Sequence, residues 1–251
     1  MLDNKNIFFK KKFLIYGLGK SGISTYKFLK KEKEIFLYDD QKISSRDERI
    51  KKKILNYKEL IKKKFDYIIV SPGINIYECK LSKFLKKNLN RIHTDLDIFY
   101  SIYNQNKIIT ITGTNGKSTT AKILYEILRD QKMDVRLVGN IGNPVLLEKN
   151  IRKNTLFVIE ASSYQLDYSK LFKSNISAIL NISPDHLERH KTMNKYIEAK
   201  FKLIKNQTKE DYAILNTNDS YIKKILKKNF FLSTIIKIKK NINSQVVKKI
   251  N

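Results

Sequence analysis

The sequence predicts an α/β protein with two units, residues 1–93 and 94–251, each built around a mainly parallel sheet. Short β-branched runs alternate with amphipathic stretches, which is the pattern of strand–helix–strand units. Two of these runs lead directly into glycine-rich turns, as strands do where open α/β sheets bind ligands. With 251 residues, 41% of them hydrophobic and 30% charged, the chain can bury the cores of two modest domains.

The formal net charge of +27 suggests a nucleic-acid-binding module as one alternative. The lysines, however, fall in short groups, such as Lys10–Lys12, Lys51–Lys53 and Lys62–Lys64. No basic helix or aromatic–basic stacking platform accompanies them. We therefore expect a solvated cationic surface and no nucleic-acid partner.

Cysteine content and hydropathy exclude several classes of protein. Cys79 is the single cysteine, which excludes a disulfide scaffold and cysteine-based zinc sites. The apolar run Phe13–Tyr16 is too short for a signal peptide, and no stretch approaches the ~20 apolar residues of a membrane span. We expect a cytoplasmic protein without membrane insertion.

The first glycine turn follows the predicted strand Phe13–Tyr16. The run Gly17–Gly22 has the spacing G-x-G-x-x-G, and the next strand, Ile35–Tyr38, ends at Asp39 and Asp40. An acid about twenty residues beyond the first glycine suits a ribose hydroxyl, so this Rossmann-like unit is predicted to bind a nucleotide-type ligand. The alternative is that the glycines serve only close helix–strand packing.

The rest of this unit is less distinctive. A strand at Tyr67–Val70 leads into a Pro72–Gly73 turn, at a strand end where ligands bind. Residues 41–64 suggest one helix, and a structural or exposed role is expected for His93. Residues 101–107 read as a connecting stretch.

The second glycine turn is the strongest signal in the chain. A buried strand, Ile108–Thr112, breaks at Gly113 and Gly116, and a helix begins near Ser118. Backbone N–H groups, the helix dipole and Lys117 would converge on a phosphate, and the serine hydroxyl can reach Mg²⁺. We expect ATP to bind here, although the first glycine lies two positions later than in the usual phosphate loop. An ordinary turn with an exposed lysine is the alternative.

Further candidates follow later strands. The strand at residues 134–138 leads into a glycine- and asparagine-rich loop, and the strand Leu156–Ile159 delivers Glu160 to its end, where phosphate-loop proteins place a metal-binding carboxylate. A strand at Ser177–Ile182 precedes His186 and His190, whose neutral imidazoles could ligate a metal.

The end of the chain is read more simply. A helix is predicted at Met193–Ile204, where Lys200 reads as a surface charge from composition. A strand follows at Tyr212–Asn216. Residues 230–251 show no recognisable motif.

Four ordered motifs resemble the Mur ligases of peptidoglycan synthesis: Thr112–Thr119, Glu160–Leu166, Leu180–His190 and Tyr196–Lys200. The displaced glycine of the phosphate loop is the form that this family uses. The Gly17–Gly22 turn and the Ser162–Leu166 run are most similar to the members that act on D-glutamate. The resemblance implies a Rossmann-like domain at residues 1–93 and a partial P-loop-type ATP-binding domain at residues 94–251.

The resemblance also implies an ADP-forming ligase. ATP would phosphorylate the carboxylate of UDP-N-acetylmuramoyl-L-alanine, and the amine of D-glutamate would displace phosphate from the acyl phosphate. The reaction would occur in the cytoplasm, in a monomer, and would need Mg²⁺, with two ions expected.

Residue roles carry over by position. Lys117, His186 and Lys200 would be catalytic, and Lys200 would be carbamylated. Ser118, Glu160, His186 and Lys200 would bind metal. ATP would contact Gly113, Thr114, Asn115, Gly116, Lys117, Ser118 and Thr119. The substrate would contact Lys20, Ser21, Asp39, Asp40 and Gly73 through its uridine part, and Asn140, Ser162 and Gln165 through its muramoyl and alanyl parts.

Members of the family extend well beyond residue 251, through a C-terminal ligase domain that supplies the D-glutamate site. We therefore expect the chain to be a fragment, or an incomplete product that is inactive alone. The competing hypotheses are an NAD-dependent oxidoreductase built on Gly17–Gly22, and another ligase of the superfamily such as a folylpolyglutamate synthetase. The first leaves Lys117 and Glu160 unexplained, and the uridine-site motif argues against the second.

Overall fold

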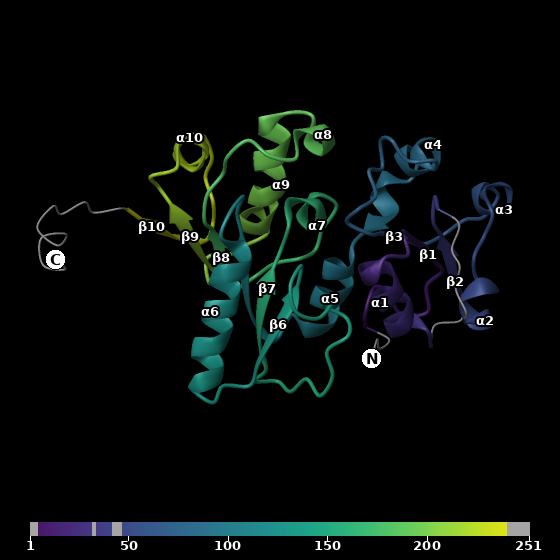
Figure 1. The fold of residues 1–251 in the computed structure, drawn as a ribbon, viewed down its shortest axis with the longest axis horizontal. Coiled ribbons are helices and arrows are strands. Elements are labelled where there is room, and N and C mark those ends of the chain that lie inside the picture. The colour runs from purple at the N-terminus through teal and green to yellow at the C-terminus, as the bar shows by residue number, and fades with distance from the viewer. Residues whose placement is uncertain (1–4, 32–33, 42–46, 240–251) are drawn as a thin grey trace, which may run out of the picture.

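The fold contains two parallel β-sheets (Figure 1). The computed structural model describes residues 5–31, 34–41 and 47–239. The first sheet has the strand order β2-β1-β3-β4. Its strands are β1 (Phe13–Tyr16), β2 (Ile35–Tyr38), β3 (Tyr67–Val70) and β4 (Ile92–His93). All of its strand pairs are parallel, which confirms the predicted class for this part.

The second sheet has the order β10-β9-β8-β5-β7-β6, again with every pair parallel. Its strands are β5 (Lys107–Thr112), β6 (Val135–Gly139), β7 (Leu156–Glu160), β8 (Ile176–Ile179), β9 (Tyr212–Asn216) and β10 (Thr234–Ile238). The central strands are apolar and buried, as expected when helices cover both faces of a parallel sheet.

Helices connect the strands, and α6 packs on β5, β6 and β7. In chain order they are α1 (Lys20–Leu29), α2 (Glu48–Lys51), α3 (Tyr57–Ile61), α4 (Ser82–Lys86), the 3₁₀ turn Leu89–Arg91, α5 (Asp95–Tyr103), α6 (Lys117–Asp130), α7 (Ser163–Asp167), α8 (Leu187–His190), α9 (Met193–Lys205) and α10 (Ser220–Lys228).

Several sequence-based expectations were wrong. The single helix expected at 41–64 is replaced by α2 and α3, with residues 42–46 outside the described part of the chain. Residues 101–103 belong to α5 rather than to a connection. The strand expected to reach Ile182 ends at Ile179, because the Ile182 N–H instead donates to the side chain of Asp219 at 2.6 Å. The segment without a recognised motif contains β10.

Helix α5 joins the two sheets through a shared apolar core. Its Leu96, Ile98 and Phe99 are fully buried, in a cluster that also contains Phe13 from the first sheet and Phe157 from the second. The Phe99 and Phe157 rings meet edge to face with centroids 4.8 Å apart. Because each buried side chain of this size stabilises a fold by about 1.5–3 kcal/mol, this helix fixes one sheet against the other.

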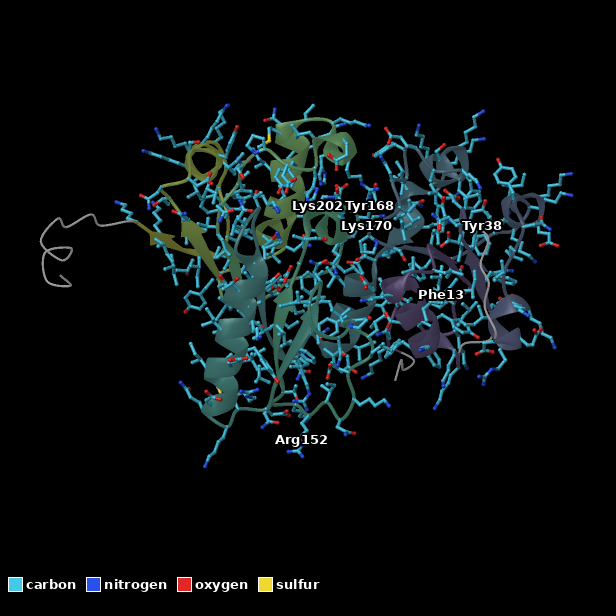
Figure 2. The ribbon with its side chains drawn as sticks, in the orientation of Figure 1. Phe13, Tyr38, Arg152, Tyr168, Lys170 and Lys202 are labelled. Carbon is cyan, nitrogen blue, oxygen red and sulfur yellow. The ribbon has the colours of Figure 1, made fainter. Side chains whose placement is uncertain are left out.

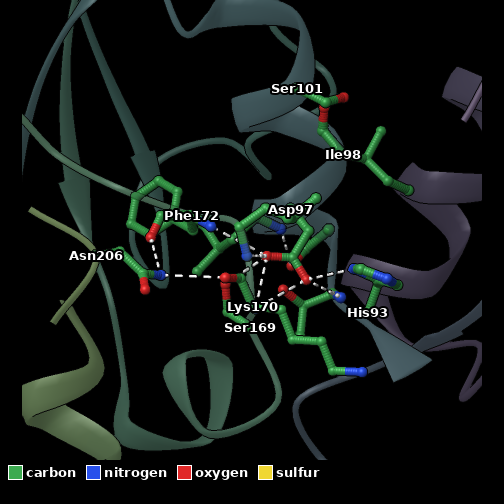
Figure 3. Close-up of polar contacts among 12 residues, drawn as sticks. His93, Asp97, Ile98, Ser101, Ser169, Lys170, Phe172 and Asn206 are labelled. Carbon is green, nitrogen blue, oxygen red and sulfur yellow. Dashed lines mark hydrogen bonds and ion pairs between the residues drawn. The ribbon is translucent and has the colours of Figure 1, made fainter. Parts of the chain in front are cut away.

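A buried carboxylate on the same helix adds polar contacts (Figure 3). Asp97, fully buried, accepts hydrogen bonds from His93 Nδ1 at 3.1 Å, from Ser169 Oγ at 2.6 Å and from the Leu171 N–H at 2.8 Å. Burial alone would raise its pKa, but these hydrogen bonds outweigh burial and hold the pKa of Asp97 below its ordinary value. His93 therefore has a structural role, which is one of the two roles expected from the sequence.

We expect Asp97→Asn to lower the free energy of unfolding by about 3 kcal/mol, because an amide cannot accept every one of these hydrogen bonds. Urea denaturation at neutral pH measures this loss. Since the folded-state pKa is depressed, the stabilisation is present above the ordinary pKa of about 3.9 and is lost as the pH falls below it. The difference between the two proteins should therefore shrink in acid.

Asp95→Asn is the matched control. Burial raises the pKa of Asp95, the opposite shift in the same helix. Its replacement should therefore leave the neutral-pH stability unchanged or increase it. An equal loss in both variants would contradict the assigned role of Asp97.

Candidate functional site

Both glycine turns lie where the strand order of their sheet reverses. In the first sheet β1 lies between β2 and β3, and in the second β5 lies between β7 and β8. Open α/β sheets bind ligands in the crevice beyond the carboxyl ends of such strands. The turns that start at Gly17 and Gly113 therefore occupy the positions at which ligands are expected.

The turn after β5 has the backbone of a phosphate-binding loop. Gly116 is the N-cap of α6 and has φ +81°, a conformation that favours glycine. The Thr114 N–H donates to the Asn181 carbonyl at 3.0 Å, and the Asn115 N–H donates to the Asn181 side chain at 2.8 Å. The first N–H groups of α6 have no acceptor within the helix and, with the helix dipole, favour an anion.

Lys117 opens α6 and lies over this loop, with its Nζ donating to the Thr114 carbonyl at 2.7 Å. Ser118 and Thr119 are exposed at the same helix end. The seven residues predicted to bind ATP thus form the turn after the central strand β5 and the first turn of α6.

Glu160 ends β7 beside this loop, in register with Ile111 of β5 and Gly139 of β6. Its side chain is fully buried. One oxygen accepts from Asn140 Nδ2 at 2.8 Å, whereas Oε2 has no hydrogen-bond partner among the residues that the structure describes. A buried carboxylate oxygen without a partner is costly, and a cation would relieve that cost. Glu160 therefore fits the predicted metal-binding role.

Lys200, read from composition as a surface charge, is 1% exposed. It lies on α9 and its Nζ donates to the Gly113 carbonyl of the phosphate loop at 2.8 Å. Burial and then the nearby charge of Lys117 lower its pKa to about 7, against an opposing effect of Asp185. A lysine that is half neutral near pH 7 is a nucleophilic amine rather than a fixed cation.

His186 is half-exposed and precedes α8 in the left-handed conformation, with φ +53°. Such strain in a non-glycine residue is common at functional sites. Its ring lies near Tyr164, with centroids 4.9 Å apart. The second candidate, His190, is buried and its Nε2 lies 3.0 Å from Ser163 Oγ, so it serves the packing of α8.

Tyr196 connects these groups and was not predicted as a site residue. Its hydroxyl lies 3.0 Å from Thr114 Oγ1, and its ring lies 4.6 Å from Lys200 Nζ and 6.2 Å from the His186 ring. At its helical spacing the sequence shows only a core aromatic, because the partners are far away along the chain. The structure thus gathers the phosphate loop, His186 and Lys200 around one tyrosine.

The acidic and histidine side chains of the described residues form no cluster of three or more that could hold a metal by itself. Mg²⁺ commonly takes one or two carboxylates and completes its shell with water and substrate phosphates. Glu160 and Ser118 beside a phosphate loop match that donor set.

In the first sheet, close packing explains part of the glycine pattern. A Cβ on Gly22 would lie 1.8 Å from the Gly17 carbonyl oxygen. Asp39 accepts from the Leu18 N–H at 2.6 Å, and Asp40 accepts from the Tyr16 hydroxyl at 2.7 Å. Both acids therefore lie at the glycine turn, as the substrate prediction requires.

The remaining predicted substrate residues are exposed or take part in local bonds. Lys20 and Gly73 are exposed near the same turn. Ser21 Oγ donates to Asp95 at 2.5 Å. Ser162 and Gln165 form the reciprocal capping box of α7, so their side chains already have a structural function.

The described part of the chain contains no helix that is long and apolar enough to cross a membrane. Parallel sheets with a phosphate loop, a buried strand-end acid and a buried lysine define an α/β protein with a phosphate-binding site. Residues 111–250 match the Mur ligase middle domain, and residues 11–93 match the MurD-like N-terminal domain of Mur ligases. The chain belongs to the Mur ligase family, which confirms the resemblance seen in the sequence.

Curated relatives support this assignment. The chain is 40% identical over 229 residues to a UDP-N-acetylmuramoylalanine--D-glutamate ligase of Lachnoclostridium phytofermentans, covering 87% of this chain and 50% of the relative. It is 37% identical over 214 residues to the protein of the same name from Rickettsia bellii, covering 84% of this chain and 47% of the relative. The chain thus spans about half the length of these relatives.

Solved structures share the fold. The UDP-N-acetylmuramate:L-alanyl-gamma-D-glutamyl-meso-diaminopimelate ligase of Neisseria meningitides matches with a TM-score of 0.59 and 14% identity, over 90% of this chain and 77% of that one. A murein peptide ligase of Psychrobacter arcticus matches with a TM-score of 0.53 and 14% identity, over 90% of this chain and 53% of that one.

Proposed function

We propose that this chain provides the substrate-binding and ATP-binding parts of a ligase that joins D-glutamate to UDP-N-acetylmuramoyl-L-alanine and releases ADP. One observation carries the proposal: the phosphate loop, the unpartnered oxygen of Glu160 and the amine of Lys200 meet at one edge of the second sheet. The names of the curated relatives support the choice of substrates.

Each residue then has a chemical role. The 113–119 loop and Lys117 bind the triphosphate and stabilise the charge that develops on the transferred phosphoryl group. Transfer of the γ-phosphoryl group to the carboxylate of UDP-N-acetylmuramoyl-L-alanine releases ADP and forms an acyl phosphate. The amine of D-glutamate then attacks its carbonyl carbon, which forms the amide bond and releases inorganic phosphate. Bound Mg²⁺, held by Ser118 and Glu160, would neutralise phosphate charge. His186 and a carbamate on Lys200 would hold a second ion.

The first predicted unit, residues 1–93, would bind the uridine end of the substrate through Lys20, Ser21, Asp39, Asp40 and Gly73. Asn140, Ser162 and Gln165, within residues 94–251, would lie toward its muramoyl and alanyl parts. We also propose that the ligase is a monomer and that, as a consumer of ATP, it acts in the cytoplasm.

Titration calorimetry tests this function directly. We expect the chain to bind UDP-N-acetylmuramoyl-L-alanine, and to bind ATP more tightly when Mg²⁺ is present than when EDTA removes it. NADH serves as the control ligand. Micromolar binding of NADH without binding of the UDP-sugar would instead support an oxidoreductase.

A further inference from the structure

The short helix α8 touches both parts of the proposed site. It follows His186 directly, and one turn later Arg189 extends to the loop that follows β3 of the first sheet. Only two residues therefore separate His186, in the proposed metal site, from Arg189, which contacts the proposed uridine-binding part.

Arg189 makes an unusual set of contacts for an arginine. Its Nη2 donates to the Ile74 carbonyl at 2.5 Å and to the Tyr168 hydroxyl at 3.1 Å, and lies 3.5 Å from the Pro72 carbonyl. Its guanidinium lies over the rings of Tyr164 and Tyr168, 5.2 Å from each centroid. Among the described residues it has no carboxylate partner within ion-pair distance.

Two neighbouring contacts also join the first part of the chain to the second in this region. The Tyr168 hydroxyl also accepts from the Ile76 N–H at 3.3 Å, and Lys191 pairs with Glu78. Figure 2 shows Tyr168 in this region between the two sheets. A cavity of ≈ 380 Å³ lies beside these groups, so polar contacts rather than continuous packing join the sheets here.

The loop that Arg189 contacts is itself fixed to the first glycine turn. Ser71 Oγ donates to the Gly17 carbonyl at 2.6 Å. A continuous series of contacts therefore runs from the Gly17 turn through residues 71–74 and Arg189 to α8 and His186. Several acceptors around one planar cation suit a guanidinium, whereas a lysine ammonium could not stack and bond in the same way.

We propose that Arg189 is a positioning residue that fixes the 71–74 turn relative to the His186 loop. A substrate held by the first sheet is thereby presented to the phosphate loop of the second. The role in substrate alignment rests on the proposed function, whereas the role in holding the two sheets does not. Misplacement of about 1 Å between reacting groups can lower the rate a hundredfold, so a contact that fixes the distance between the two sheets affects catalysis.

The first experiment measures the distance between the sheets by single-molecule FRET and needs no ligand. Dyes are attached to Lys58→Cys on α3 and Lys223→Cys on α10, both exposed and at opposite ends of the molecule, in a Cys79→Ser background (Figure 1). Arg189→Ala should broaden the distance distribution toward longer values. The control is Arg129→Ala, which also removes an arginine stacked on a tyrosine, Tyr125, but within α6 alone.

If the distance distribution of Arg189→Ala equals that of the unsubstituted chain, the proposed role of Arg189 in holding the two sheets is wrong. If Arg189→Ala fails to fold, Tyr168→Phe decides, because it removes only the shared hydroxyl. Broadening in that variant supports the proposal, and an unchanged distribution overturns it. Arg189→Lys should recover only part of the original distribution.

The second experiment separates positioning from general damage. Arg189→Ala should weaken binding of UDP-N-acetylmuramoyl-L-alanine by about tenfold, while MgATP affinity stays within about twofold because the phosphate loop is untouched. Equal affinity of variant and unsubstituted chain for the UDP-sugar would overturn the alignment role. If the unsubstituted chain binds no UDP-sugar, the proposed function is wrong, and the FRET result still decides whether Arg189 holds the two sheets together.

Discussion

Lys117→Ala is expected to weaken MgATP binding by about 10- to 100-fold. This factor corresponds to the 1.5–3 kcal/mol that hydrogen bonds to charged groups typically contribute. Lys117 is the cation of the phosphate loop, and its Nζ already lies 2.7 Å from the Thr114 carbonyl within that loop. Calorimetric titration of the chain with MgATP measures the effect.

The same substitution should leave the fold intact. The Lys117 side chain is only partly buried and its one described hydrogen bond stays within the loop, so the unfolding midpoint should change little. Lys122→Ala removes an equal charge from the exposed side of the same helix and serves as the control. Comparable affinities for the Lys117 and Lys122 variants would exclude the phosphate-loop interpretation.

The strands next to the glycine turns could be predicted because two local signals coincide there. The β-branched run of β5 and the glycines after it both favour a strand followed by a turn, and the apolar, aromatic run of β1 before Gly17 does the same. Helix α5 could not be recognised from its periodicity, because Asp95 and Asp97 are buried with the apolar residues and erase its polar face. Strand β10, with the sequence Thr-Ile-Ile-Lys-Ile, is mostly exposed at the edge of its sheet, so its short apolar run carries no pattern of a buried strand.

The candidate site shows the same limit. The phosphate loop and Glu160 were predictable because each lies at the end of a strand that is visible in the sequence. The burial of Lys200 was not, because the Gly113 carbonyl that accepts its hydrogen bond is 87 residues away along the chain. Tyr196 and Arg189 were missed for this reason as well, since their partners are defined only by the fold.

Lys200 is expected to form a carbamate with dissolved CO₂. Its neutral amine attacks the carbon of CO₂, a C–N bond forms, and one proton is released to solvent. A pKa of about 7 makes about half of the amine reactive at neutral pH, whereas an ordinary lysine is almost entirely protonated there. The charge of Lys117, which lowers the pKa of this amine, would also stabilise the carbamate anion.

Carbon-13 NMR of the chain in ¹³C-labelled bicarbonate measures this modification. At a fixed CO₂ concentration the carbamate signal should rise as the pH passes from 6 to 8, because deprotonation of the amine supplies the nucleophile. Lys200→Ala should abolish the signal. Lys202→Ala should retain it, because Lys202 lies two positions further along α9 and its Nζ donates to the Asp167 carbonyl. A signal that persists in Lys200→Ala would place the carbamate elsewhere and remove Lys200 from the proposed metal site.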